Sequence, residues 1–199
     1  MSGSTRLVVL ISGFGSNLQA ILDACAAGEL QTQVVAVVSN KREAAGLDRA
    51  RKAGVPALVK PRLKDQDRCQ YDSELAELVA SYRPDWVILA GWMRILSSEF
   101  LRHFPNRVVN LHPALPGAFP GTDAIQRAFE AYQGGLIRQT GVMLHLVPDE
   151  GVDSGPVLAR QVIPIEPGDT LETLEERVHA AEHALLVSTL KELVKASSQ

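Results

Sequence analysis

Residues 7–20 read LVVLISGFGSNLQA, and this stretch decides the fold. Five apolar, mostly branched residues give a short strand pattern, Gly13 and Gly15 lie in the turn after it, and apolar residues at helical spacing begin beyond Asn17. A strand that passes through a glycine turn into a helix is the first unit of an open α/β sheet.

The same succession repeats as far as residue 111. Further β-branched runs predict strands, and most of the stretches between them carry apolar residues at helical spacing. Strands joined by helical crossovers lie parallel, so the pattern predicts a doubly wound, mostly parallel sheet. The predicted strands span residues 7–12, 34–39, 57–60, 86–90 and 108–111, and the predicted helices span residues 17–27, 43–53 and 73–82.

The rhythm changes after residue 111. A passage rich in proline and glycine covers residues 112–121, and a helix is expected near residues 123–132. Extended runs at 142–147 and 157–165 are joined by an acidic turn too short for a crossover helix, which predicts an antiparallel pair. A final helix is expected over residues 170–195, with Thr170 and Thr173 as capping residues. The fold class is therefore α/β, a single doubly wound sheet with an antiparallel C-terminal extension.

Composition narrows the class of protein. At 199 residues and 46% hydrophobic, the chain can bury one sizeable core, so one domain over residues 1–199 is expected. The 20 basic and 23 acidic side chains are spread along the chain without a basic stripe, which disfavours nucleic acid as a partner. No run approaches the roughly 20 apolar residues of a membrane span, and the first run is too short for a signal peptide, so a cytoplasmic setting is expected. Cys25 and Cys69 lack metal-site spacing and are expected to be reduced thiols.

The glycine turn can hold an anion. Backbone N–H groups and the helix dipole meet where the first strand enters the first helix, which favours phosphate. The third position of a dinucleotide fingerprint falls on Leu18, and no P-loop lysine follows, so a dinucleotide is disfavoured. The alternative is an ordinary strand-to-helix turn in which glycines supply positive φ.

Asn110 and His112 end the last clear parallel strand. Strand alternation places both side chains on one face, and Pro113 keeps His112 extended, at the edge where such sheets bind ligands. A structural histidine is the alternative.

The acidic turn at residues 149–155 does not have the spacing of an EF-hand. A carboxylate from this turn beside an imidazole would fix the tautomer and raise the pKa of the histidine.

The other candidate functional residues also have simple structural interpretations. His145 is expected among apolar neighbours in a strand, and His103 on a short helix. His179 and His183 have the i, i+4 spacing of a zinc site but no third ligand, so a solvated helix face is preferred. The segment at residues 92–96 suits either an aromatic heterocycle with an acidic tail or plain core packing.

Six segments, taken in order, resemble the phosphoribosylglycinamide formyltransferase family and cover nearly the whole chain. Relatives within the same chemistry, formyltetrahydrofolate deformylase and methionyl-tRNA formyltransferase, carry a further domain before or after this one and are the minor alternatives. In this chain Ala114 stands where many members have serine, and residues 145–153 run one residue longer. The six segments are LISGFGSNLQA (10–20), VVSNKREAAGLDRARKAG (37–54), DWVILAGWMRIL (85–96), VVNLHPALPG (108–117), HLVPDEGVDSGP (145–156) and RVHAAEHALL (177–186).

The resemblance implies a Rossmann-like formyltransferase fold and direct formyl transfer from 10-formyltetrahydrofolate to the amine of glycinamide ribonucleotide in purine synthesis, with no metal. It implies a catalytic trio of Asn110, His112 and Asp153. The phosphate would be held by Gly15, Ser16 and Asn17, and the ribose end by His179, Ala180, Ala181 and Glu182. The folate would be held by Arg68, Met93, Arg94, Ile95, Leu96, Asn110, Pro148, Asp149, Glu150, Gly151, Val152 and Asp153.

The chemistry asks for stabilisation of a tetrahedral oxyanion and for a proton on the departing folate nitrogen. We hypothesise that protonated His112, held by Asp153, and the amide of Asn110 do the first, and that His112 does the second. Small-molecule substrates are the expected partners, with a homodimer as one option for assembly. From a different class, a non-catalytic nucleotide-binding module would use the glycine turn alone.

Overall fold

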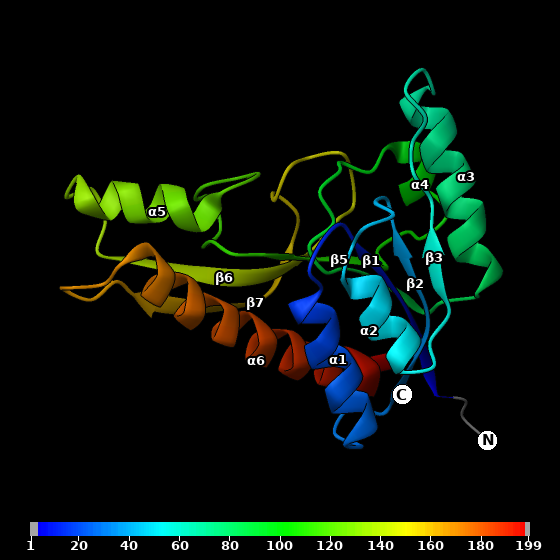
Figure 1. Ribbon diagram of the computed structural model, residues 1–199, viewed down its shortest axis with the longest axis horizontal. Helices are drawn as coiled ribbons and strands as arrows, with labels where there is room; N and C mark the ends of the chain where they lie inside the picture. Colours follow the sequence, from blue (N-terminus) through cyan, green and yellow to red (C-terminus); the bar gives the residue numbers. More distant parts are fainter. Residues whose placement is uncertain (1–3, 198–199) are drawn as a thin grey trace.

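The computed structural model describes residues 4–197, in which seven strands form one sheet with the order β3-β2-β1-β4-β5-β6-β7 (Figure 1). β1 lies at the centre and is buried on both faces, as expected for a parallel sheet that helices cover on both sides. The strands are β1 (Thr5–Ile11), β2 (Thr32–Ser39), β3 (Ala57–Val59), β4 (Trp86–Leu89), β5 (Val108–His112), β6 (Gln139–Leu146) and β7 (Val157–Pro164).

Helices cover the sheet in two layers. One apolar cluster joins alternate residues of β1, such as Leu7 and Val9, to α1, α2 and the C-terminal half of α6. The intervening residues Val8 and Leu10 face α3 and α4 on the opposite side. Figure 1 shows α1 alongside the end of α6. The helices are α1 (Ser16–Ala26), α2 (Gly46–Lys52), α3 (Arg68–Ser81), α4 (Ser98–Leu101), α5 (Ala124–Gln133) and α6 (Leu171–Ser197).

Strand directions confirm the predicted fold class. β1 pairs in parallel with β2 and β4, β2 pairs in parallel with β3, and β4 with β5. The last two strands reverse: β6 runs antiparallel to β5, and β7 antiparallel to β6. In this register Asn110 lies opposite His145, and His112 lies opposite Met143. The antiparallel extension therefore begins beside the residues singled out on β5.

Several element ends differ from the sequence prediction. α3 begins at Arg68, five residues early, because the Asp67 carboxylate accepts the Gln70 N–H at 3.0 Å and caps the helix. β6 begins at Gln139, and His103 follows α4 instead of lying on it. Thr170 caps α6 as predicted, since its hydroxyl accepts the Thr173 N–H at 3.3 Å.

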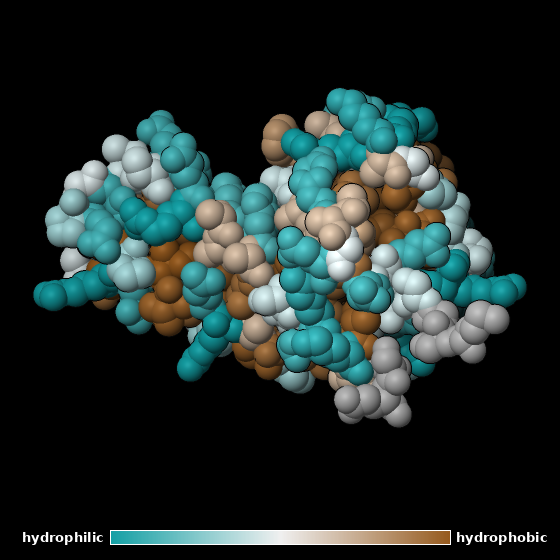
Figure 2. Space-filling model, turned by 90° about the horizontal axis from the view of Figure 1, so that it is seen from below, coloured by the Kyte–Doolittle hydropathy of each residue, from teal (hydrophilic) through white to brown (hydrophobic). Residues whose placement is uncertain are grey.

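The surface carries hydrophilic and hydrophobic residues side by side. In Figure 2 hydrophilic residues occupy most of the outer rim of the face seen from below, with hydrophobic atoms between them. Among residues 4–197, no helix has both the length and the apolar character needed to cross a membrane.

Candidate active site

A cavity of about 460 Å³ opens beside the carboxyl ends of β4 and β5. Four segments line it: the end of β4 with the loop after it, the end of β5, the start of α5 with the residues before it, and the β6–β7 loop together with the end of β6. Asn110, His112 and Asp153 all contribute to its wall. The cavity therefore lies in the crevice where open α/β sheets bind ligands.

The Asp153 carboxylate is the centre of the polar wall. Its Oδ1 accepts a hydrogen bond from the Asn110 amide at 3.0 Å, and its Oδ2 lies 3.3 Å from His112 Nδ1 and accepts the Gly121 N–H at 2.8 Å. Asp153 has φ 50°, a left-handed conformation that aspartate tolerates better than most residues. The expected meeting of the acidic loop with the end of β5 is thus present in the structure.

His112 is buried, with 3% of its surface exposed. Its Nε2 lies 3.1 Å from the Phe119 carbonyl oxygen, which can only accept, so Nε2 carries the proton in the neutral ring. Burial lowers the pKa of His112 below its ordinary value and outweighs the nearby Asp153 charge, which raises it. The expectation that the pKa of His112 is raised is therefore wrong, because desolvation is the larger effect.

Asp153 is ionised over a wider range than a free aspartate. Burial raises its pKa, but the nearby imidazoles of His145 and His112 and the hydrogen bond that the carboxylate accepts from the Gly121 N–H outweigh burial and leave the pKa below its ordinary value. A fixed negative charge thus faces His112.

His145 is the residue that sequence reasoning missed. Its Nδ1 lies 2.8 Å from the Leu146 carbonyl oxygen and so carries the proton, which leaves Nε2 to accept from the Asn110 amide at 3.1 Å. The reverse orientation of the Asn110 amide would set its oxygen against Asp153, so the nitrogen is the atom that faces these two groups. Both amide hydrogens of Asn110 are therefore engaged by Asp153 and His145, and neither is directed at an open oxyanion position.

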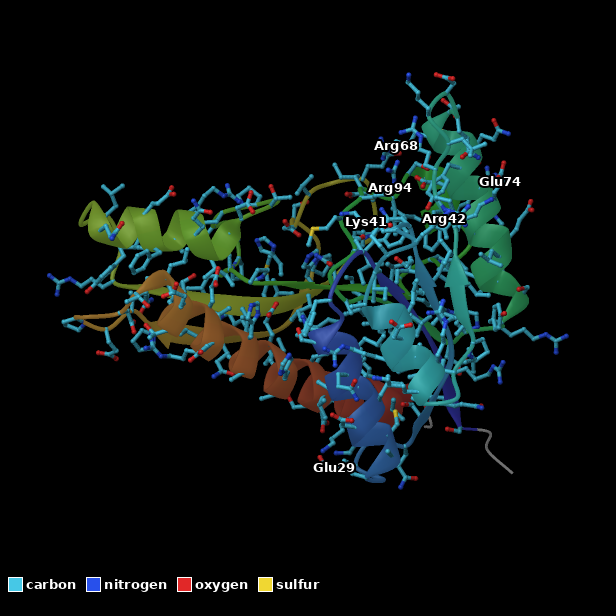
Figure 3. All side chains as sticks on the ribbon, viewed as in Figure 1. Glu29, Lys41, Arg42, Arg68, Glu74 and Arg94 are labelled. Carbon is cyan, nitrogen blue, oxygen red and sulfur yellow. The ribbon has the colours of Figure 1, made fainter. Side chains whose placement is uncertain are left out.

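The residues assigned to the folate by resemblance divide into two sets. Met93, Arg94, Ile95, Leu96, Asp149, Gly151, Val152 and Asp153 line the cavity together with Asn110, whereas Arg68, Pro148 and Glu150 do not. Arg68 binds Glu150 at 2.8 Å, and Glu150 also accepts the Ser98 N–H at 2.9 Å. Figure 3 shows Arg68 and Arg94 on the same side of the molecule. Arg68 therefore anchors the β6–β7 loop at the cavity rim.

The glycine turn lies next to the cavity without lining it. Gly15 is the N-cap of α1 and has φ 77°, and Ser16 and Asn17 form the first turn. The Ser12 hydroxyl accepts the Met93 N–H at 2.8 Å, which connects this turn to the cavity loop. The Asn17 side-chain oxygen is buried and has no hydrogen-bond partner in the described part of the chain.

The residues of α6 assigned to the ribose end differ in burial and in hydrogen bonding. Glu182 is 4% exposed, and its carboxylate lies 2.6 Å from His179 Nδ1, a hydrogen bond that raises the pKa of His179. Ala180 is exposed, whereas the side chain of Ala181 packs in an apolar cluster. Burial lowers the pKa of His183.

The chain is similar to known proteins of one family. The sequence pattern of the formyl transferase family matches residues 5–190. A phosphoribosylglycinamide formyltransferase from Schizosaccharomyces pombe is 47% identical over 94% of this chain and 96% of that protein. The crystal structures of glycinamide ribonucleotide transformylase 1 from Symbiobacterium toebii and Geobacillus kaustophilus match with TM-scores of 0.91 and 0.89 and identities of 39% and 40%. They cover 98% and 96% of this chain, which spans 90% and 100% of theirs. The chain therefore belongs to the formyl transferase family, among the phosphoribosylglycinamide formyltransferases.

Proposed function

We propose that this chain transfers the formyl group of 10-formyltetrahydrofolate to the amine of 5′-phosphoribosylglycinamide in de novo purine synthesis. The products are formylglycinamide ribonucleotide and tetrahydrofolate. The observation that carries the proposal is the Asp153 carboxylate, which contacts Asn110 and His112 at the wall of a cavity large enough for a small molecule. Membership of the formyl transferase family supports formyl as the transferred group.

The cavity suits the folate, which is the co-substrate that carries the formyl group. Exposed Met93, Ile95 and Val152 offer apolar faces to a flat ring. The ring nitrogen of Trp92 and Nε of Arg94 are buried without hydrogen-bond partners in the described residues, so polar edges and an anionic tail have donors to meet. Arg68 and the loop of residues 148–153 complete this proposed site.

The ribonucleotide is assigned to the adjoining turn and helix. The N–H groups of Gly15, Ser16 and Asn17 would hold its phosphate, because the start of α1 favours an anion. Glu182, with His179 and the backbone at Ala180 and Ala181, would hold its ribose end. The Met93 N–H donates to the Ser12 hydroxyl, and this contact supports a ribonucleotide site beside the folate site.

In the reaction the amine nitrogen bonds to the formyl carbon, and the bond from that carbon to the folate nitrogen breaks. The amine loses a proton and the folate nitrogen gains one, so no net proton is consumed. We assign stabilisation of the charged formyl oxygen to Asn110, which would exchange its hydrogen bond with His145 for one to this oxygen, and to His112. His112 delivers the proton to the folate nitrogen, with Asp153 stabilising the imidazolium.

An assay of formyl transfer from 10-formyltetrahydrofolate to glycinamide ribonucleotide tests the proposal. A folded sample without turnover would refute it. Calorimetry with reduced folate then separates the rival class, since a nucleotide-binding module should give no folate heat. We place the reaction in the cytoplasm, with one domain carrying both sites and small molecules as partners.

A further inference from the structure

The glycine turn is held in place from outside by α2. The Gly46 N–H donates to the Gly13 carbonyl at 3.1 Å, and Arg49 Nε donates to the Phe14 carbonyl at 2.9 Å. A Cβ on Gly15 would lie 2.7 Å from Gly46 Cα, so turn and helix are in direct contact. Two successive carbonyl groups of the turn therefore point toward α2.

The direction of these carbonyls fixes the direction of the N–H groups that follow them. In a trans peptide the N–H of a residue points away from the carbonyl of the preceding residue. The N–H groups of Phe14 and Gly15 therefore point away from α2. Neither donates to any acceptor in residues 4–197, and the same holds for Ser16 and Asn17 in the first turn of α1. Consecutive free N–H groups of this kind form an anion-binding concavity.

Arg49 makes three contacts, two with Phe14 of the turn and one with Gln19 of α1. Besides the bond to Phe14 O, its Nη1 donates to Gln19 Oε1 at 3.1 Å on α1, and its guanidinium carbon lies 4.4 Å from the centre of the Phe14 ring. Gln19 in turn donates its own N–H to the Gly15 carbonyl at 2.9 Å. Arg49 thus connects α2, the turn and α1, and no carboxylate within residues 4–197 forms an ion pair with it.

We propose that Arg49 is a positioning residue of the phosphate site: it aims the Gly15 N–H at the phosphate of the ribonucleotide by holding the Phe14 carbonyl. This inference rests on the proposed function and adds a residue outside both substrate sites. A hydrogen bond that involves a charged group contributes enough for its loss to cost about tenfold or more in affinity. The effect falls on the phosphorylated substrate alone, because the folate cavity does not include this turn.

The test compares Arg49→Met and Arg49→Lys with a matched control, Arg51→Met. Arg51 lies on the same helix, is exposed and, within residues 4–197, forms an ion pair with Asp48 alone. For Arg49→Met we expect the KM for the ribonucleotide and the Ki for ribose 5-phosphate to rise about tenfold or more. We expect kcat and the folate KM to change by less than about twofold, and Arg51→Met to match the wild type. Arg49→Lys keeps the charge but loses the directed guanidinium contacts, so it should recover only a minor part of the loss.

An unchanged ribonucleotide KM in Arg49→Met overturns the inference. An equal rise in the folate KM also overturns the inference, because it indicates general damage to the protein. Full recovery in Arg49→Lys overturns it as well, since charge alone would then suffice. The failure of the proposed function looks different, because the wild type itself would lack turnover. Calorimetry with ribose 5-phosphate on the wild type and Arg49→Met then still decides the role of Arg49, and absence of binding to the wild type counts against it.

Discussion

Replacing Asp153 by asparagine removes the charge beside His112 and turns one of the two oxygens that accept hydrogen bonds into a donating NH2 group. Asparagine has nearly the same size and tolerates the left-handed φ of 50° at this position, so the backbone is not strained. At 3.3 Å, with an effective dielectric constant of about 20, the carboxylate favours the imidazolium by about 5 kcal/mol. The Gly121 N–H and His145 already share the carboxylate, so that figure is an upper bound. Losing even one third of this interaction energy lowers the protonated fraction of His112 more than tenfold. The rate falls by the same factor.

The pH dependence of kcat/KM for the ribonucleotide shows whether the Asp153 charge tunes the pKa of His112. The reaction needs protonated His112 and an unprotonated amine, whose ordinary pKa is about 7.7–8.0. In the enzyme without substrate, burial lowers the pKa of His112 from its ordinary 6.5, and so keeps it below the pKa of the amine. Below both values the rate rises with pH, between them it is level, and above the amine pKa it falls. His112 therefore sets the acid limb, which reverses the assignment to the alkaline limb that a raised pKa would give.

In Asp153→Asn the pKa of His112 falls further, because a favourable charge is lost. The acid limb should move to lower pH and the level region should drop more than tenfold. At the lowest pH, where His112 is protonated in both proteins, the two rates should converge. The assay is a profile of kcat/KM in overlapping buffers at constant ionic strength, with Asp65→Asn on an exposed loop as the control. A ratio of wild type to variant that stays constant with pH refutes the reasoning, and would mean that Asp153 only orients the loop.

Three further outcomes are expected. Asn110→Ala should lower kcat about 10²-fold, since one donor to a developing oxyanion is lost, and steady-state kinetics that show a change in KM alone would make it a binding contact. Gly15→Val should raise the KM for the ribonucleotide and leave the folate KM nearly unchanged, because φ 77° and the close Gly46 Cα admit no side chain; equal losses would indicate a damaged fold. Arg177 holds the pKa of Asp169 at about 2, so this pair stabilises the fold above pH 3.8 and its contribution is lost as pH falls through about 2. Thermal melts of Asp169→Asn should show a lower Tm than the wild type above that window, and an unchanged Tm throughout would contradict the assignment.

The parts that the sequence predicts are those that local patterns determine. Strand alternation placed Asn110 and His112 on one face, because side chains alternate with a period of two residues. Continuous β-branched runs located the parallel strands, because such strands are buried on both faces. The early start of α3 was also readable, since Asp67 is a common N-cap residue with the Gln70 N–H three positions on.

The parts that stayed hidden depend on long-range geometry. His145 meets Asn110 only through the register of β5 with β6, and the segment between these strands, residues 113–138, leaves that register open to sequence reasoning. The sign of the pKa shift at His112 depends on how completely distant segments bury it, which no local pattern reports. Arg49 reads as an ordinary helical arginine until α2 is seen against the glycine turn.

The site exists because the sheet reverses direction at β6. A parallel strand next to β5 would have ended beside His112 and sent its loop outward from the sheet edge. The antiparallel β6 instead ends near Val109, at the other end of β5, and the loop that follows folds back to His112 before β7 begins beside the end of β6. The Leu146 N–H donates to the Pro156 carbonyl at the base of this loop, and a side chain on Gly155 would collide with the Leu146 carbonyl oxygen. The return path brings Asp153 over His112, while the reversed strand brings His145 beside Asn110. One change of strand direction thus supplies both groups that hold the β5 side chains in place.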